Sequence, residues 1–132
     1  MLEIRIDNTI RMEGELDQIS ETYPVEVTHK GSSLYLRYRN SEDQQVVLKG
    51  TAREWVMTRF ASPKSIMRFS LDGLTQSLFV TNHGQLPIYI QTQSLDYAEN
   101  DQHVRISYSL YLDPDCQQEL AHYDLAISWG NF

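Results

Sequence analysis

Cysteine is almost absent from this chain of 132 residues, and basic residues are few. A single cysteine cannot form an internal disulfide, so the sequence suits a reducing compartment such as the cytoplasm. The 11 lysine and arginine residues are outnumbered by 18 aspartate and glutamate residues, which gives a net charge of −7. That balance excludes a broad basic footprint for nucleic acid or anionic lipid. We therefore expect no nucleic-acid partner.

No segment combines the length and the apolarity of a membrane span. The stretch 73–95 carries no Asp, Glu, Lys or Arg, but seven Gln, Asn and Gly residues interrupt it. Residues 1–5 alternate between apolar and charged side chains, unlike the cationic start and apolar core of a signal peptide. We expect a soluble, cytoplasmic protein without a membrane span.

Motifs for metal binding, phosphate binding and catalysis are missing as well. The four histidines lack metal-ligand spacing, and the six glycines form no Gly-x-Gly-x-x-Gly or Walker pattern. His29 and His83 fall in expected turns and His103 and His122 on polar strand faces, so we expect all four to be exposed. Cys116 has no adjacent histidine to activate it. We expect no metal, no cofactor and no catalytic residues, although triads are assembled in space and a sequence leaves that possibility open.

What the chain does contain is period-two alternation along almost its whole length, the pattern of β-strands. In 104–112 the even positions are apolar, and in 123–129 the odd positions are apolar. About ten such segments follow one another at spacings of roughly 8–12 residues, as in antiparallel sandwiches and barrels. Within 86–97 the apolar parity changes, which predicts a β-bulge near Gln93 and Ser94. The residues 1–132 are expected to form a single all-β domain.

The turns between these segments are short, so strands adjacent in sequence should pair as a meander. A meander of this length has two exposed edges, and closure into a barrel removes them. We therefore predict a closed antiparallel up-and-down β-barrel of about 8–10 strands, with the first and last strands adjacent. A β-sandwich is the alternative. Trp55 and Trp129 each continue an apolar face and should both be buried.

Several segments resemble the YwiB-like bacterial proteins, a domain of unknown function with a calycin-like, or lipocalin-like, β-barrel. The matching segments are 34–38 (LYLRY), 67–73 (MRFSLDG) and 79–95 (FVTNHGQLPIYIQTQSL), together with the strand that ends in Arg59. The family pattern places an arginine, a phenylalanine, a Thr-x-x-Gly and a later threonine along the chain, and these positions are filled here by Arg59, Phe69, Thr81, Gly84 and Thr92. Ala61 departs from the pattern where a glycine is expected, and Phe79 where a tyrosine is expected. The resemblance implies a calycin-like barrel and brings no established activity.

Arg59 is the one cation expected on an apolar strand face. Trp55, Met57 and Arg59 share a parity, so if the first two point inward, Arg59 lies at the inner rim of the barrel. An arginine there can hold a carboxylate or phosphate through a bidentate fork, and fatty-acid carriers of the calycin group use internal arginines in this general way. There are two alternatives: a structural one, in which Arg59 pairs with a protein carboxylate or caps backbone carbonyls, and plain exposure of its side chain to solvent.

Four further residues are candidates for contact with a ligand inside the barrel: Tyr38, Tyr108, Thr92 and Trp55. Tyrosines on apolar faces can line a cavity and bond a polar group, but they also fill the cores of small barrels. The first functional hypothesis is a non-catalytic module that binds a small apolar or amphipathic molecule in the barrel interior. The second is a structural or protein-interaction domain with a filled core and an unidentified protein partner.

Overall fold

A computed structural model describes all 132 residues and contains eleven β-strands. None of the chain forms the long apolar helix that crosses a membrane. The strands are β1 (Glu3–Met12), β2 (Glu15–Pro24), β3 (Glu26–Lys30), β4 (Ser33–Arg39), β5 (Gln45–Gly50), β6 (Glu54–Phe60), β7 (Ser65–Ser70), β8 (Thr75–Thr81), β9 (Gly84–Ala98), β10 (His103–Tyr111) and β11 (Glu119–Gly130).

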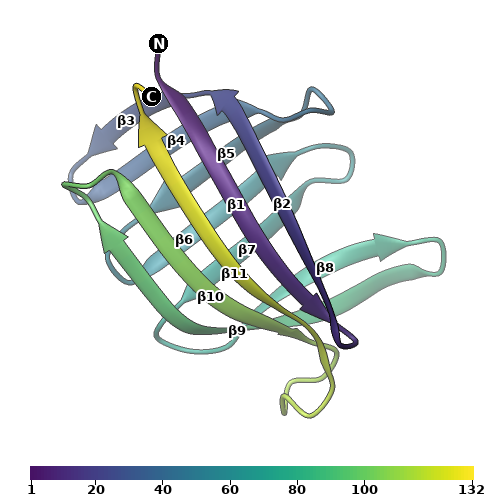
Figure 1. Cartoon of the computed structure of the whole chain (residues 1–132). Coiled ribbons are helices and arrows are strands. Elements are labelled where there is room, and N and C mark those ends of the chain that lie inside the picture. The colour runs from purple at the N-terminus through teal and green to yellow at the C-terminus, as the bar shows by residue number, and fades with distance from the viewer.

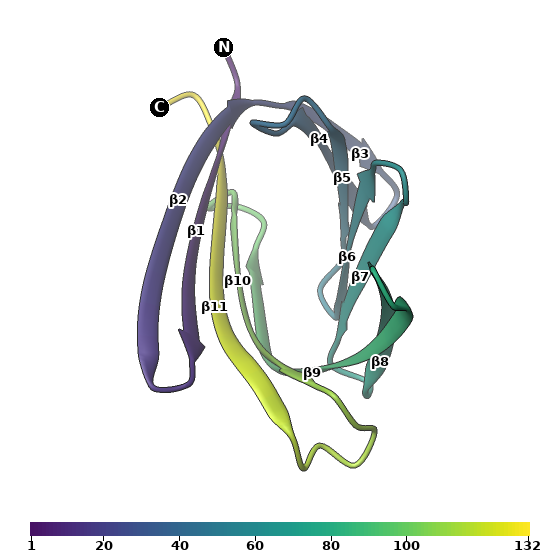
Figure 2. The same ribbon diagram turned by 90° about the vertical axis from the view of Figure 1, so that its right-hand side faces the viewer.

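The strands form two antiparallel sheets that face each other (Figures 1 and 2). Sheet A has the order β2-β1-β11-β10-β9-β8 and is curved into a half-barrel, and sheet B has the order β3-β4-β5-β6-β7. The first and last strands pair along nine residue pairs, among them Ile4 with Trp129. The predicted adjacency of the chain's first and last strands is therefore confirmed, as is the all-β antiparallel class.

The prediction of a single closed barrel is wrong, and the calycin-like fold is not confirmed. No backbone ladder joins the two sheets. On one side the chain passes from β2 to β3 through Val25, whose N–H donates to the carbonyl of Leu2 at 3.1 Å. On the other side the short turn from β7 to β8 connects strands that belong to different sheets. The short turn predicted a backbone ladder between β7 and β8, and this prediction is wrong.

Side-chain hydroxyls bridge β7 and β8 in place of a backbone ladder. The Oγ of Ser77 donates to the carbonyl of Ile66 at 2.7 Å, and the Oγ1 of Thr75 donates to the carbonyl of Arg68. Ser77 is buried, and its bond to the carbonyl of the exposed residue Ile66 is partly buried. These two bonds form the β7–β8 seam, which holds sheet A against sheet B on this side.

The core lies between the sheets and is dominated by aromatic and aliphatic side chains. Trp55 and Trp129 are both buried, as predicted, and their rings lie 6.1 Å apart between centroids. The register of sheet B places Gly50 opposite Trp55. A Cβ on Gly50 would overlap the indole ring, so the ring fits against the strand only because residue 50 has no side chain.

The predicted bulge in β9 is confirmed. Ser94 pairs with Ser107 and Thr92 pairs with Tyr108, so Gln93 is the extra residue on the β9 strand. A bulge bends its strand and reverses the inward parity, which explains why Ile88 and Ile90 on one side and Leu95 on the other are all buried. Figure 2 shows β9 curving from sheet A toward sheet B, where it carries β8 to the seam.

The change Gly50→Ala should destabilise the fold by about 1–3 kcal/mol, because the added methyl must displace the Trp55 ring in a close-packed core. Urea denaturation followed by tryptophan fluorescence measures the effect. The neighbouring change Lys49→Ala, on the outer face of the same strand, should alter stability by less than about 0.5 kcal/mol. Equal effects of the two changes would contradict this account of the packing.

The change Ser77→Ala should cost about 1 kcal/mol, because it removes the partly buried hydrogen bond between the Ser77 hydroxyl and the Ile66 carbonyl. Thr75→Val removes the equivalent bond at an exposed position, where water can replace the hydroxyl, and should cost less. Thermal unfolding of both variants, followed by circular dichroism, tests the order. A larger loss in Thr75→Val would mean that the seam does not depend mainly on the Ser77 bond.

Candidate functional site

The inner face of sheet B has three successive rows of residues, and the outermost row contains Arg59. The register places Tyr38, Val46, Arg59 and Ser65 side by side across β4, β5, β6 and β7. Toward the core, the next row contains Met57 and the one after it Trp55. The inward parity predicted for Trp55, Met57 and Arg59 thus puts Arg59 at the rim of the inter-sheet space, where its head group is exposed.

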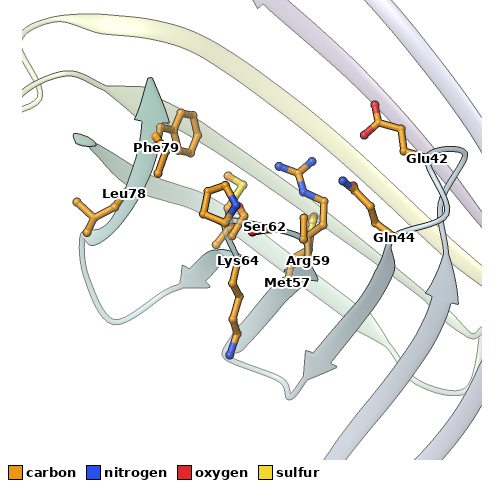
Figure 3. A pocket seen from close by; sticks show the side chains of 13 residues that line it. Glu42, Gln44, Met57, Arg59, Ser62, Lys64, Leu78 and Phe79 are labelled. Carbon is orange, nitrogen blue, oxygen red and sulfur yellow. The ribbon is translucent and has the colours of Figure 1, made fainter. Parts of the chain in front are cut away.

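A pocket of about 550 Å³ lies beside Arg59 at this rim (Figure 3). Its walls come from β6, β7 and β8 and from the turns that follow β4 and β6. One part is apolar and the other carries hydroxyl, amide and charged groups. The lining residues include Met57, Arg59, Ser62, Ser65, Met67 and Phe79.

The guanidinium of Arg59 has no ion pair or hydrogen bond with any protein group. Among the other four arginines of residues 26–70, Arg37 also lacks an ion pair, and three are paired: Arg39 with Asp43, Arg53 with Asp72, and Arg68 with Glu54. Figure 3 shows the Arg59 side chain extending beside that of Gln44, with Phe79 across the pocket and Lys64 directed away from it. Neither structural partner considered for Arg59, a carboxylate or a backbone carbonyl, is present.

Tyr38 is close enough to Arg59 for the charge of the guanidinium to affect the pKa of Tyr38. Burial raises the pKa of Tyr38 above its ordinary value, Glu21 and Tyr23 raise the pKa further, and Arg59 opposes them. The Tyr38 ring stacks on that of Tyr23 with centroids 5.3 Å apart. Tyr38 does not line the Arg59 pocket; it lines a separate depression at the passage from β2 to β3.

None of the other three candidate residues lines the pocket: Tyr108 and Trp55 lie in the core, and Thr92 is half-buried on β9. The ring of Tyr108 stacks on Tyr123 at 4.8 Å and contacts Phe69 at 4.6 Å between centroids. Trp55 is buried, with its ring edge against Tyr97. The Nε1 of Trp55 and the Oγ1 of Thr92 are buried without a hydrogen-bond partner. The fold therefore brings Tyr38 near Arg59 and keeps Tyr108, Thr92 and Trp55 apart from both.

A polar cluster on the outer face of sheet A was not foreseen. The Oγ of Ser109 lies 2.9 Å from Nδ1 of His122, whose Nε2 lies 3.5 Å from the Asp124 carboxylate. These residue types match a catalytic triad, but Ser109 is only 1% exposed, and its oxygen also accepts a bond from Gln93 at 3.0 Å. The cluster therefore links β9, β10 and β11 and does not present a nucleophile. The β10–β11 register, which pairs Ser109 with His122, was the signal that could have revealed it.

The expected exposure of the histidines is confirmed for two of the four. His83 is exposed in the turn where it was expected, and His29 is exposed but lies in β3 and not in a turn. His103 and His122 are half-buried: Arg105 of the same strand donates to His103, and Ser109 of the neighbouring strand contacts His122. A polar strand face is not the same as a solvated one.

Alkaline pH should destabilise the protein through Tyr108. Burial raises the pKa of Tyr108 above its ordinary value, so the folded state keeps the phenolic proton where the unfolded chain loses it. The contribution is complete below the ordinary tyrosine pKa of about 10 and is lost as the pH rises above it, by up to about 1.4 kcal/mol per pH unit.

Urea denaturation at several pH values from neutral to strongly alkaline tests this expectation. The variant Tyr108→Phe should lose less stability than the wild type over the same alkaline interval, with each protein referred to its own stability at neutral pH. Identical alkaline slopes in the two proteins would contradict the assignment to Tyr108.

Comparison with known proteins places the chain in a family. No curated protein matches it. The crystal structure of the ywiB protein from Bacillus subtilis has the same fold, with a TM-score of 0.76, 18% sequence identity, and coverage of 98% of this chain and 92% of that chain. At that identity the likeness shows the fold alone. The family model described as "Domain of unknown function (DUF1934)" matches residues 4–127. The resemblance to YwiB-like proteins is thus confirmed, and the chain belongs to the DUF1934 family.

Proposed function

We propose that this domain is a non-catalytic binding module that holds a small amphipathic molecule with an anionic head group in the pocket beside Arg59. The observation that carries the proposal is the unpaired guanidinium on the inner face of sheet B. Arginine presents several N–H donors in a planar fork that fits carboxylate and phosphate, and here no protein group occupies that fork. An anionic head group would satisfy it.

The walls of the pocket suit the rest of such a ligand. Met57, Met67 and Phe79 supply apolar surface, and methionine adapts to irregular shapes. The hydroxyls of Ser62 and Ser65 lie on the same wall as Arg59 and can donate to a head group. The volume of about 550 Å³ falls within the range of small-molecule sites, roughly 300–1,000 Å³.

The ligand is proposed at the rim and not in the centre of the fold. Aromatic rings fill the space between the sheets, where Trp55, Tyr97 and Trp129 form one cluster and Phe69, Tyr108 and Tyr123 another. This packing argues against a ligand cavity lined by Tyr108, Thr92 and Trp55. The same packing supports the second candidate function, a structural or protein-interaction domain without a ligand. For either function, the single cysteine suits a cytoplasmic setting.

The change Arg59→Met tests the binding function. Because Arg59 has no protein partner, the change should leave stability within about 0.5 kcal/mol of the wild type. The probe is a medium-chain fatty acid. Arg59→Met should abolish the rise in melting temperature that this fatty acid causes, and its binding should no longer be detectable by calorimetry. The corresponding fatty alcohol, which has the same chain and no charge, should bind weakly and equally to both proteins.

Lys64→Met is the matched control, because it removes a cation at the rim of the same pocket whose side chain points away from it. This variant should retain fatty-acid binding. Loss of several kcal/mol of stability in Arg59→Met, together with no ligand-dependent shift in the wild type, would favour the structural alternative. Equal binding losses in both variants would show general attraction to positive charge instead of a site at Arg59.

A further inference from the structure

β2 is the terminal strand of sheet A and is open to solvent on three sides. It pairs with β1 over ten residue pairs and with no other strand. Every residue of β2 except Tyr23 is exposed, so neither face of the strand is covered by other parts of the protein apart from the end where Tyr23 stacks on Tyr38. Figure 2 views the molecule from the side of this strand, and no other strand of sheet A lies beyond it.

The outer edge of β2 retains the features that allow another strand to pair with it. A strand bonded along one edge leaves N–H and C=O groups unpaired along the other. Proteins commonly block such edges with bulges, prolines or lysines. The β1–β2 register is unbroken from Glu3 to Met12, so β2 has no bulge, and its only proline, Pro24, is its last residue. The strand carries no lysine or arginine.

The charge of β2 determines which strand would fit. Glu15, Asp17 and Glu21 share the inner face, and none of them forms an ion pair. If β2 paired with β2 of a second copy around Ile19, Asp17 would stand opposite Glu21. Like charges directly opposite each other destabilise a sheet. A segment with cations at alternate positions would instead neutralise these carboxylates.

We propose that the free edge of β2 accepts an extended, basic segment of a partner protein as an additional strand. Backbone hydrogen bonds to the edge provide the affinity, and alternating Lys or Arg side chains facing Glu15, Asp17 and Glu21 provide the selectivity. The site is separate from the Arg59 pocket, which no residue of β2 lines. A negative result for ligand binding at Arg59 would therefore leave this proposal unaffected, and the reverse also holds.

A short peptide of alternating lysine and threonine is the probe, and fluorescence anisotropy measures its binding at low salt. Hydrogen exchange then identifies the bound segment, because strand addition should slow exchange of amides in β2. The double change Asp17→Lys with Glu21→Lys should weaken binding by about tenfold or more, since attraction becomes repulsion. Glu99→Lys with Asp101→Lys, at the exposed turn after β9, should leave binding within about twofold of the wild type.

Two further peptides distinguish strand addition from charge attraction. A peptide of the same charge with a central proline cannot complete the backbone bonds and should bind much more weakly. A peptide with glutamate in place of lysine should not bind. The proposal is overturned if the proline peptide binds as well as the first, or if exchange in β2 is unchanged. Dimerisation that protects β2 without peptide would overturn it too, by assigning the edge to a second copy.

Discussion

Two hydroxyl groups on β8 hold the sheets together where no backbone ladder crosses between them. Ser77 and Thr75 donate to carbonyls of β7, so this side of the molecule is closed by side chains. The Arg59 pocket depends on the same contact, because Phe79 on β8 and Met67 on β7 are two of its walls. Without these two bonds, β8 would be positioned only by its ladder with β9 and by the short turn from β7, and the pocket wall that contains Phe79 would be less firmly held.

Alternation in the sequence predicted the strands, the bulge at Gln93 and the burial of both tryptophans, because each depends only on which face a residue occupies. It also placed Arg59 on the inner face. Parity does not say how far along a strand the covered region extends, so Tyr108 in the core and Arg59 at the rim were indistinguishable. Closure failed for a related reason: a short turn shows that two strands are neighbours but not which atoms join them.

The net charge of −7 is the sum of a cationic part of the chain and a more strongly anionic part. Residues 26–70, which contain sheet B, hold eight of the 11 basic residues and four of the 18 acidic ones, a net charge of +4. The remainder therefore carries −11. The two proposed sites follow this division, with the anion site at Arg59 in the cationic part and the acidic edge strand β2 in the anionic part. A protein with this asymmetry has a large electric dipole, which orients approaching charged partners.

The pairing of β1 with β11 also affects how the protein is made. β11 lies between β1 and β10, so the centre of sheet A is completed only when Glu119–Gly130 has joined a strand from the opposite end of the chain. Contacts of such long sequence separation slow folding, because the whole intervening loop must be ordered first. On the ribosome, β1 cannot pair with β11 until nearly all of the remaining chain has emerged. During that interval the edge of β1 that pairs with β11 in the finished sheet is unpaired, and the nascent chain is most exposed to aggregation.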